Sequence, residues 1–222
     1  MTGDALIVFV KAPRPGDVKT RLIPALGAEG AAAFYRILAE EEARRTAPQA
    51  GDYTRLFFFA PVDAHDAIAA WFPGEVLVAQ QGADLGARMA AAFEESFRRG
   101  ARRAAIVGTD VPWVSREIVL EAFRALDDHD LALGPAHDGG YYLLALARTC
   151  PEIFRGIPWS TPDVLSATVA KAEALGVTVK TLETLTDIDT LEDVRTAWAA
   201  LEPILAGAPA LAGALSRALA SA

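Results

Sequence analysis

The sequence predicts an α/β fold whose sheet is mostly parallel. Short unbroken apolar runs, such as residues 6–10 and 105–107, are typical of strands buried on both faces of a parallel sheet. Segments with helical spacing alternate with these runs, which is the pattern of α/β layering. Glycine and proline mark the boundaries, as at Gly100, Pro112 and Gly176.

The composition is typical of one soluble domain that acts on small molecules. The chain has 222 residues, 52% of them hydrophobic, and we expect residues 1–206 to form the domain and residues 207–222 a helical tail. The formal net charge of -8 argues against a nucleic-acid surface. The single cysteine excludes an internal disulfide, and no apolar run approaches the roughly 20 residues of a membrane span. We expect a cytoplasmic protein without a membrane span, and the tail leaves open a homo-oligomer.

The first strand, residues 6–10, leads directly into a basic loop at residues 11–21. Two prolines and Gly16 fix an irregular turn that carries four cations: Lys11, Arg14, Lys19 and Arg21. Cations at the end of a strand can neutralise charge on a transferring or departing phosphate. The alternative is a solvated basic loop, and the Walker pattern is absent.

Residues 28–46 then predict a helix, residues 55–60 a strand, residues 64–71 a short helix and residues 76–79 a strand. Asp84 follows as the expected N-cap of a helix that ends at Gly100. Flanking glycines permit close approach by a ligand, and Arg88 lies one turn from Asp84. For Arg88, a contact with phosphate or carboxylate and a surface ion pair both remain open.

The central motif joins a strand, an acidic turn and a helix. The apolar run at residues 105–107 ends at Gly108, and Asp110 follows before Pro112. Ser115 is the expected N-cap of the next helix. Ligands of open α/β sheets bind outside the carboxyl ends of the strands, so Asp110 is well placed to coordinate a cation that carries phosphates. A turn-capping aspartate is the alternative.

Residues 131–144 predict a strand, a glycine-rich turn and a second strand. His137 and Asp138 stand before Gly139 and Gly140, where a sugar or base could lie against the backbone. Asp138 could bind metal or a ligand hydroxyl, although Asp-Gly is also a hairpin signal.

The last motifs surround two further helices. Thr161 is the expected cap of a helix that ends at Gly176, and Trp159 and Ser160 would lie at its N-terminus, where an anion or acceptor could bind. A plain cap with a packed tryptophan is the alternative. After a strand at residues 177–182, Asp187 and Asp189 precede a helix with a capping box and could complete a cation site begun by Asp110.

Taken in order, these motifs resemble the bacterial family called radical-SAM/selenodomain-associated transferase 1, whose members are provisionally assigned as glycosyltransferases. The segments that carry the resemblance are residues 11–22, 81–89, 108–112, 133–142, 159–161 and 187–190. The family is similar to nucleotide-diphospho-sugar transferases of the GT-A fold, including the molybdenum-cofactor and 2-phospholactate guanylyltransferases. The resemblance implies a three-layer Rossmann-like mixed sheet and handling of a nucleotide with Mg²⁺ or Mn²⁺.

Two departures from the related nucleotidyltransferases bear on the substrate. Their first loop is usually a Gly-Gly-x-Gly loop, whereas this loop is proline-rich and basic, which leaves the donor base open. Val111 and the bulky Trp113 replace a small residue and a polar one, and Trp113 could reshape the acceptor side.

The resulting prediction is a transferase that uses a nucleoside triphosphate or a nucleotide sugar and a small-molecule acceptor. The expected catalytic residues are Asp110, Lys19 and Asp138, and the expected metal ligands are Asp110, Asp187 and Asp189. The expected nucleotide or phosphate contacts are Lys11, Arg14, Gly16, Lys19, Thr20, Arg21, Asp84, Arg88, Gly108 and Thr109. The expected acceptor contacts are His137, Gly139, Gly140, Tyr141, Trp159, Ser160 and Thr161. The alternative function is a nucleotide-binding sensor or accessory protein without turnover.

Overall fold

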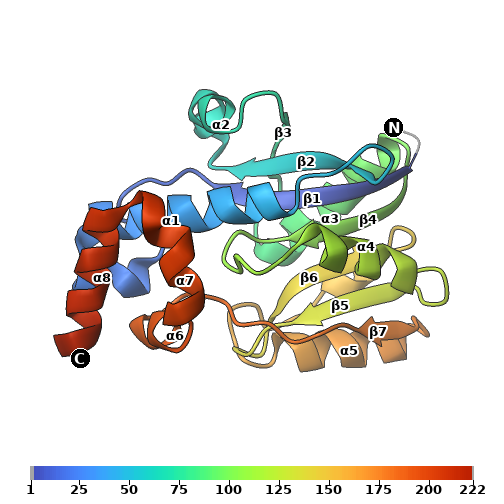
Figure 1. The fold of residues 1–222 in the computed structure, drawn as a ribbon. Helices are drawn as coiled ribbons and strands as arrows, with labels where there is room; N and C mark the ends of the chain where they lie inside the picture. Colours follow the sequence, from blue (N-terminus) through green and yellow to red (C-terminus); the bar gives the residue numbers. More distant parts are fainter. Residues whose placement is uncertain (1–2, 222) are drawn as a thin grey trace.

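The computed structural model describes residues 3–221 and is built on a seven-stranded sheet (Figure 1). The strands are β1 (Gly3–Lys11), β2 (Tyr53–Ala60), β3 (Val76–Ala79), β4 (Ala101–Val107), β5 (Leu131–Pro135), β6 (Tyr141–Leu146) and β7 (Val179–Thr181). Their order across the sheet is β3-β2-β1-β4-β6-β5-β7. Only β6 runs antiparallel to its neighbours, β4 and β5, so the predicted mostly parallel mixed sheet is confirmed.

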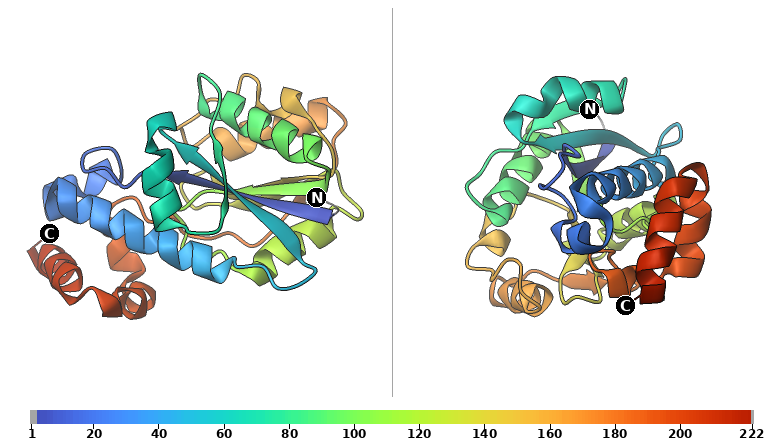
Figure 2. Two further views of the ribbon diagram at one scale, coloured as in Figure 1. Left: turned by 90° about the horizontal axis from the view of Figure 1, so that it is seen from above. Right: turned by 90° about the vertical axis from the view of Figure 1, so that its left-hand side faces the viewer.

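Helices cover both faces of the sheet (Figure 2). One face carries α1 (Ile23–Arg45), α2 (His65–Trp71) and α4 (Arg116–Ala125), and the other carries α3 (Leu85–Arg98) and α5 (Val164–Ala174). Short 3-10 helices lie at Thr20–Leu22 (η1), Val62–Ala64 (η2), Pro151–Phe154 (η3) and Leu205–Gly207 (η4). Neighbouring side chains of a strand point to opposite faces, so Ile7 packs in one core and Val8 in the other. Double burial therefore explains the unbroken apolar runs.

The register of the sheet brings two predicted motifs together. β1 lies between β2 and β4, and Val8 of β1 pairs with Val107, the last residue of β4. Both strands run in the same direction. The basic loop after β1 and the Asp110 turn after β4 therefore leave the sheet at the same edge, which faces the viewer in the right-hand view of Figure 2.

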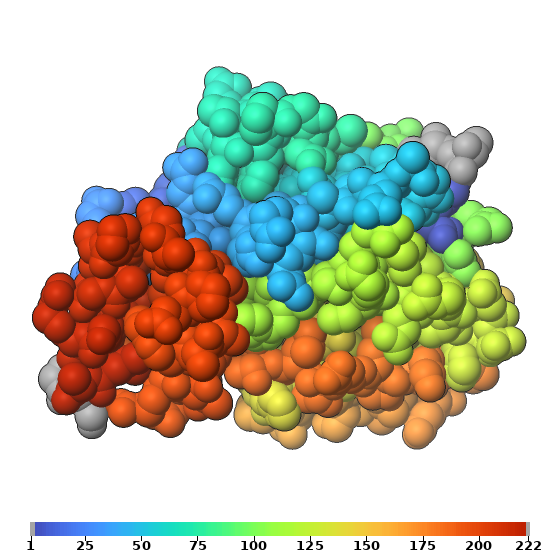
Figure 3. Space-filling model, in the orientation of Figure 1, coloured from blue at the N-terminus to red at the C-terminus, as the bar shows by residue number. Residues whose placement is uncertain are grey.

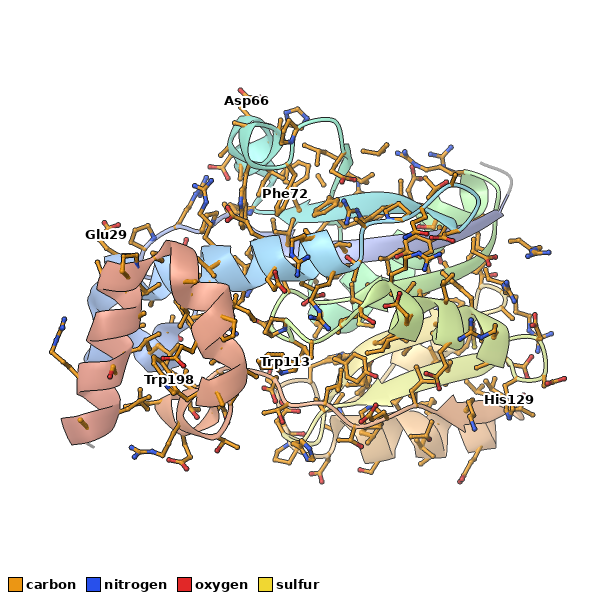
Figure 4. The ribbon with its side chains drawn as sticks, viewed as in Figure 1. Glu29, Asp66, Phe72, Trp113, His129 and Trp198 are labelled. Atoms are coloured by element: carbon orange, nitrogen blue, oxygen red, sulfur yellow. The ribbon has the colours of Figure 1, made fainter. Side chains whose placement is uncertain are left out.

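The C-terminal helices α6 (Leu191–Thr196), α7 (Trp198–Ile204) and α8 (Pro209–Ser221) pack beside α1 (Figure 3). Leu201 and Leu215 are fully buried against Phe34 of α1 in a third apolar cluster. Trp113 packs against both this cluster and the sheet core, and its Nε1 donates to the Thr186 carbonyl at 2.9 Å (Figure 4). The helical tail thus packs on the body of the same chain.

Several predicted boundaries are confirmed and one, the cap at Thr161, is wrong. The Asp84 and Ser115 side chains cap α3 and α4, and the capping box of α6 is present. Thr161 does not cap α5, because this helix begins at Val164 and its N-cap position is Asp163. The Thr161 hydroxyl donates to the Pro158 carbonyl and accepts from the Asp163 N–H at 3.3 Å. The helix predicted from residue 28 is confirmed: α1 extends from Ile23, but its helical geometry breaks at Gly27 (φ 70°), and the unbroken part follows that glycine to Arg45.

One segment, Thr20–Arg45, has the length and apolar composition of a membrane span, with a mean hydropathy of 1.2 over its most apolar window. In the structure the apolar side chains of α1, including Phe34 and Leu38, are buried in the cores. A core helix passes the same test of length and composition.

Candidate functional site

A cavity of about 680 Å³ opens where β1 and β4 end. The basic loop and the Asp110 turn both contribute to it. The predicted residues that line it are Lys11, Lys19, Thr20, Arg21, Arg88, Gly108, Thr109, Asp110, Tyr141, Ser160 and Asp189. The structure thus gathers these residues, which span 179 positions of the sequence from Lys11 to Asp189, around one space.

Lys19 lies between two carboxylates in this cavity. Its ammonium forms ion pairs with Asp110 and with Asp189, the latter at 2.8 Å, and its side chain is only 2% exposed. Burial lowers the pKa of Lys19, but the two carboxylates outweigh burial, so the pKa is raised and the group stays charged. The backbone of Lys19 is left-handed, with φ 46° and ψ 43°, which costs a non-glycine residue about 1 to 2 kcal/mol. This ion-paired cluster was not predicted, since Lys19 was expected to meet phosphate.

A buried chain of hydrogen bonds stands behind the cluster. The backbone N–H of Lys11 donates to the Tyr35 hydroxyl at 2.9 Å, and that hydroxyl lies 2.8 Å from Thr109 Oγ1. Thr109 in turn donates to the Phe9 carbonyl at 3.3 Å, so the Tyr35 proton points to Thr109. Burial, followed by the charge of Asp110, raises the pKa of Tyr35 far above its usual value, so the hydroxyl stays neutral. Tyr35 therefore ties α1 to the ends of β1 and β4.

We expect Tyr35→Phe to lower the free energy of unfolding by about 1 to 2 kcal/mol, because Lys11 N–H loses its buried acceptor and Thr109 a buried partner. Urea unfolding of wild type, Tyr35→Phe, Thr109→Val and the double variant measures this loss and its coupling. A coupling of at least ~0.5 kcal/mol is expected for a shared bond. Strictly additive losses would mean that the two hydroxyls act independently.

Apolar and aromatic side chains form a further part of the cavity lining, here called the apolar wall. They are Phe9, Leu85, Met89, Ile106, Tyr141 and Tyr142. At its edge the Gln80 amide nitrogen donates to the Phe58 carbonyl at 2.8 Å, which leaves the amide oxygen as an acceptor. A molecule with a charged part and a flat, weakly polar part matches a cavity lined by both charged and apolar side chains.

Two cations of the cavity have no carboxylate partner within residues 3–221. They are Lys11, at the end of β1, and Arg88 on α3, whose Nε donates to the Gly82 carbonyl at 3.1 Å. Arg21, by contrast, lies 3.8 Å from Asp189 and is 71% exposed. Lys11 and Arg88 are therefore the cations most available to an anionic ligand.

Several predicted residues do not line the cavity, and local contacts explain their positions. Arg14 pairs with Asp63 at 3.0 Å on the surface. Trp159 covers the start of α3, where a Cβ on Gly86 would lie 2.7 Å from its Nε1. The remaining residues of this group are Gly16, Asp84, His137, Asp138, Gly139, Gly140, Thr161 and Asp187. Their roles in binding stay predictions.

The turn at residues 137–140 is held by its own contacts. Asp138 Oδ1 accepts from the Gly140 N–H at 2.8 Å, and the His137 N–H donates to the Leu185 carbonyl. Asp187 lies near this turn. Burial, then the charge of Asp138, raises the pKa of Asp187 to about 6, and Asp189 adds to the effect.

The carboxylates that flank Lys19 fit a divalent cation that arrives with phosphate. No group of three or more His, Cys, Asp or Glu side chains converges in the part of the chain that the structure describes. Two carboxylates, those of Asp110 and Asp189, do converge, and the Lys19 ammonium lies between them. Mg²⁺ typically takes one or two carboxylates and completes its shell with water and substrate phosphates. The donor set therefore matches a shared metal–phosphate site rather than a closed protein cage.

Sequence reasoning missed Tyr35 and, apart from Tyr141, the residues of the apolar wall. Gln80 could have been found, because it directly follows β3 and parallel strands end at the same edge. Tyr35 gave no such signal, since it lies on the apolar face of a helix and was assigned to the core.

Comparisons with known proteins agree with this architecture. The family model DUF2064, described as an uncharacterized protein conserved in bacteria, matches residues 43–161. A crystal structure from Desulfovibrio desulfuricans G20, provisionally named a nucleotide-diphospho-sugar transferase, is 33% identical with a TM-score of 0.85. The match covers 96% of this chain and 97% of the Desulfovibrio chain. No curated protein matches the chain.

Two more distant structures show the fold alone. One is a CMP:2-keto-3-deoxy-manno-octonic acid synthetase complexed with CTP, with 14% identity, a TM-score of 0.57 and coverage of 90% of this chain and 99% of that chain. The other is the 4-diphosphocytidyl-2C-methyl-D-erythritol synthase of Anaerococcus prevotii DSM 20548, with 13% identity, a TM-score of 0.54 and coverage of 90% and 98%. The family match over residues 43–161 and the 33% identity over nearly the whole chain lead to one conclusion: the chain belongs to the DUF2064 family of bacterial proteins.

Proposed function

We propose that the protein is a metal-dependent transferase that takes a nucleoside triphosphate or a nucleotide sugar as donor and a small molecule as acceptor. The observation that carries the proposal is the cluster of Lys19, Asp110 and Asp189 at the polar end of a cavity beside parallel strand ends. The 33% identity to a provisionally named nucleotide-diphospho-sugar transferase supports the same class of donor.

The charged and the apolar residues that line the cavity are assigned to different parts of the donor. Lys11 and Arg88, which lack carboxylate partners within residues 3–221, bind the phosphates through charge-assisted hydrogen bonds. The apolar wall at Phe9 and Leu85 packs against the nucleoside. Tyr141 and Ser160 also line the cavity and are assigned to the acceptor, with the rest of the apolar wall left to the nucleoside.

The polar end supplies the stabilisation of charge. Asp110 and Asp189 hold a divalent cation, Mg²⁺ or Mn²⁺, which when bound would act as a Lewis acid on phosphate oxygens. Lys11 and Arg88 compensate the negative charge that develops on the departing phosphate. Tyr35 and Thr109 keep the two strand ends at a fixed separation, so that the cations and carboxylates face the same phosphates.

A panel of nucleotides and nucleotide sugars, each with Mg²⁺, tests the proposal in two steps. Thermal shift identifies the donor that stabilises the protein, and chromatography then follows its conversion with candidate acceptors. Release of pyrophosphate or of a nucleoside diphosphate, lost in Asp110→Asn, is the expected result. A donor that binds and is recovered unchanged with every acceptor would favour the sensor function instead.

We expect Lys11→Ala and Arg88→Ala each to weaken nucleotide affinity about 10-fold, because each removes a charge-assisted contact of ~1.5 kcal/mol or more. Isothermal titration with the donor and Mg²⁺ measures the loss. Lys180→Ala is the matched control, since Lys180 is exposed on β7 and does not line the cavity. Equal losses in all three variants would reflect net charge alone, and no loss at Lys11 and Arg88 would place the phosphates elsewhere.

A further inference from the structure

The cluster around Lys19 joins three distant segments of the chain. Asp110 follows β4, Asp189 precedes α6, and Lys19 lies in the basic loop directly before η1. The same ammonium reaches Oδ1 of both carboxylates, although 170 residues separate Lys19 from Asp189. Asp110 and Asp189 remain partly open to the cavity, with side chains 52% and 39% exposed.

The backbone sets the direction of the Lys19 side chain. A residue in the left-handed region is held there only when its surroundings determine it. Leu22, three residues on, is fully buried, and its N–H donates to the Lys19 carbonyl at 2.9 Å. The loop is thus anchored directly behind Lys19, which places a nearly buried ammonium on the carboxylates instead of in solvent.

An ammonium in this position competes with a divalent cation. Both groups need the same carboxylate oxygens, and both are attracted by the same pair of negative charges. With Lys19 in place, the cluster carries a net charge of -1, from two carboxylates and one ammonium. Without Lys19 it would carry -2 and would attract a metal ion much more strongly.

We propose that Lys19 is a built-in cation that withholds the Asp110–Asp189 site from free metal and releases it to a metal–nucleotide complex. When the complex binds, the Lys19 ammonium would exchange its carboxylate partners for phosphate oxygens of the nucleotide. The Asp110 and Asp189 carboxylates would then be free to bind the metal. No covalent bond changes in this exchange. The inference rests on the proposed function, because the incoming phosphate must come from the nucleotide donor.

The exchange sets the order of binding. Metal alone would bind to two carboxylates, but it must displace an ammonium that has no other acceptor within residues 3–221. The metal–nucleotide complex supplies that acceptor, so it binds without leaving the buried ammonium unpaired. Metal alone should therefore bind weakly to the wild-type protein, and nucleotide should raise its affinity strongly.

Titration of Mn²⁺ alone, followed by electron paramagnetic resonance, tests the inference without any turnover. We expect Lys19→Met to bind Mn²⁺ at least 10-fold more tightly than wild type, since a charge that opposes the metal is gone and side-chain length is retained. Lys11→Met is the matched control, because it removes one positive charge from the same cavity but not from between the carboxylates. Equal gains in both variants, or no gain in Lys19→Met, would overturn the inference.

A second measurement uses the wild-type protein and does not depend on how well the variant folds. The ¹⁵N resonance of the Lys19 ammonium should shift when Mg²⁺ and the donor nucleotide are added together, and should not shift with Mg²⁺ alone. An unchanged resonance with the bound complex would mean that the ammonium stays on its carboxylates, against the inference.

The two failures are distinguishable. If no nucleotide binds to wild type in the presence of metal, the proposed function fails. If nucleotide and metal bind together while Lys19→Met gains no affinity for Mn²⁺, the proposed function stands and the role of Lys19 as a competing cation is refuted.

Discussion

Asp110→Asn should abolish most of the coupling between Mg²⁺ and nucleotide binding. The Asp110 carboxylate is one of two that converge on a single cation, and an amide oxygen carries no net charge to attract a metal. Coupling between two ligands of one site is typically about 5- to 150-fold, so the wild-type affinity for nucleotide should fall by such a factor when Mg²⁺ is removed. In Asp110→Asn, the affinities with Mg²⁺ and with a chelator should be nearly equal.

Isothermal titration of the nucleotide, in Mg²⁺ and in a chelator, measures this coupling on each variant. Asp17→Asn is the matched control, because Asp17 lines the same cavity but belongs to none of the ion pairs at Lys19. A comparable loss in Asp17→Asn would indicate a general effect of cavity charge. If wild type binds equally well in both media, the site does not couple metal and nucleotide at all.

The second ligand can be assigned with the same titration. Asp189 lines the cavity and shares Lys19 with Asp110, whereas Asp187 does not line the cavity and forms no ion pair within residues 3–221. Asp189→Asn should therefore reduce the coupling, and Asp187→Asn should leave it nearly intact. The opposite result would move the metal toward the turn that carries Asp138.

The fold was predictable because its signals are local. Each strand that is buried on both faces appears as an apolar run, and the caps at Asp84, Ser115 and Thr190 mark the helix starts with their side chains. The edge at which the site forms was predictable too, since parallel strands end on one side of the sheet. For this reason the basic loop and Asp110 were correctly brought together.

The inner arrangement of the site was not predictable, because it depends on contacts between distant segments. Four basic residues in one loop look equivalent in the sequence, yet Lys19 turns inward through a left-handed backbone while Arg14 pairs with Asp63 on the surface. Ser160 is a second non-glycine residue with positive φ, and it lines the cavity where the expected cap at Thr161 fails. Backbone conformations of this kind carry no signature at non-glycine positions.

The different roles of Gly139 and Gly140 were also not predictable from the sequence. Both were expected to lie against a ligand, and the sequence does not separate them. In the structure Gly139 has φ +90° and Gly140 does not have a positive φ. The close approach at Gly139 is to the backbone of Pro162, which belongs to the segment that follows Ser160. Gly139 therefore fixes a loop beside the cavity.

Gly139→Ala should lower the free energy of unfolding by about 2 to 5 kcal/mol. The left-handed backbone costs a non-glycine residue about 1 to 2 kcal/mol. A Cβ at this position would lie 2.1 Å from the Pro162 carbonyl oxygen and 2.7 Å from its carbonyl carbon, so backbone must move, at a further cost of about 1 to 3 kcal/mol. Urea unfolding measures the sum, which is a large part of the roughly 5 to 15 kcal/mol that stabilises a domain.

Two alanine variants separate the strain of the backbone from the clash. Gly51 has φ +91°, and apart from its chain neighbours no described residue has an atom within 4 Å of an added Cβ, so Gly51→Ala should show only the loss of about 1 to 2 kcal/mol from backbone strain. Gly140→Ala would place its Cβ 3.1 Å from the Asp138 carboxylate, a side chain that can move, so its loss should be the smallest of the three. If Gly139→Ala is no less stable than Gly51→Ala, the contact with Pro162 is not tight, and the loop that carries Ser160 is not fixed by this glycine.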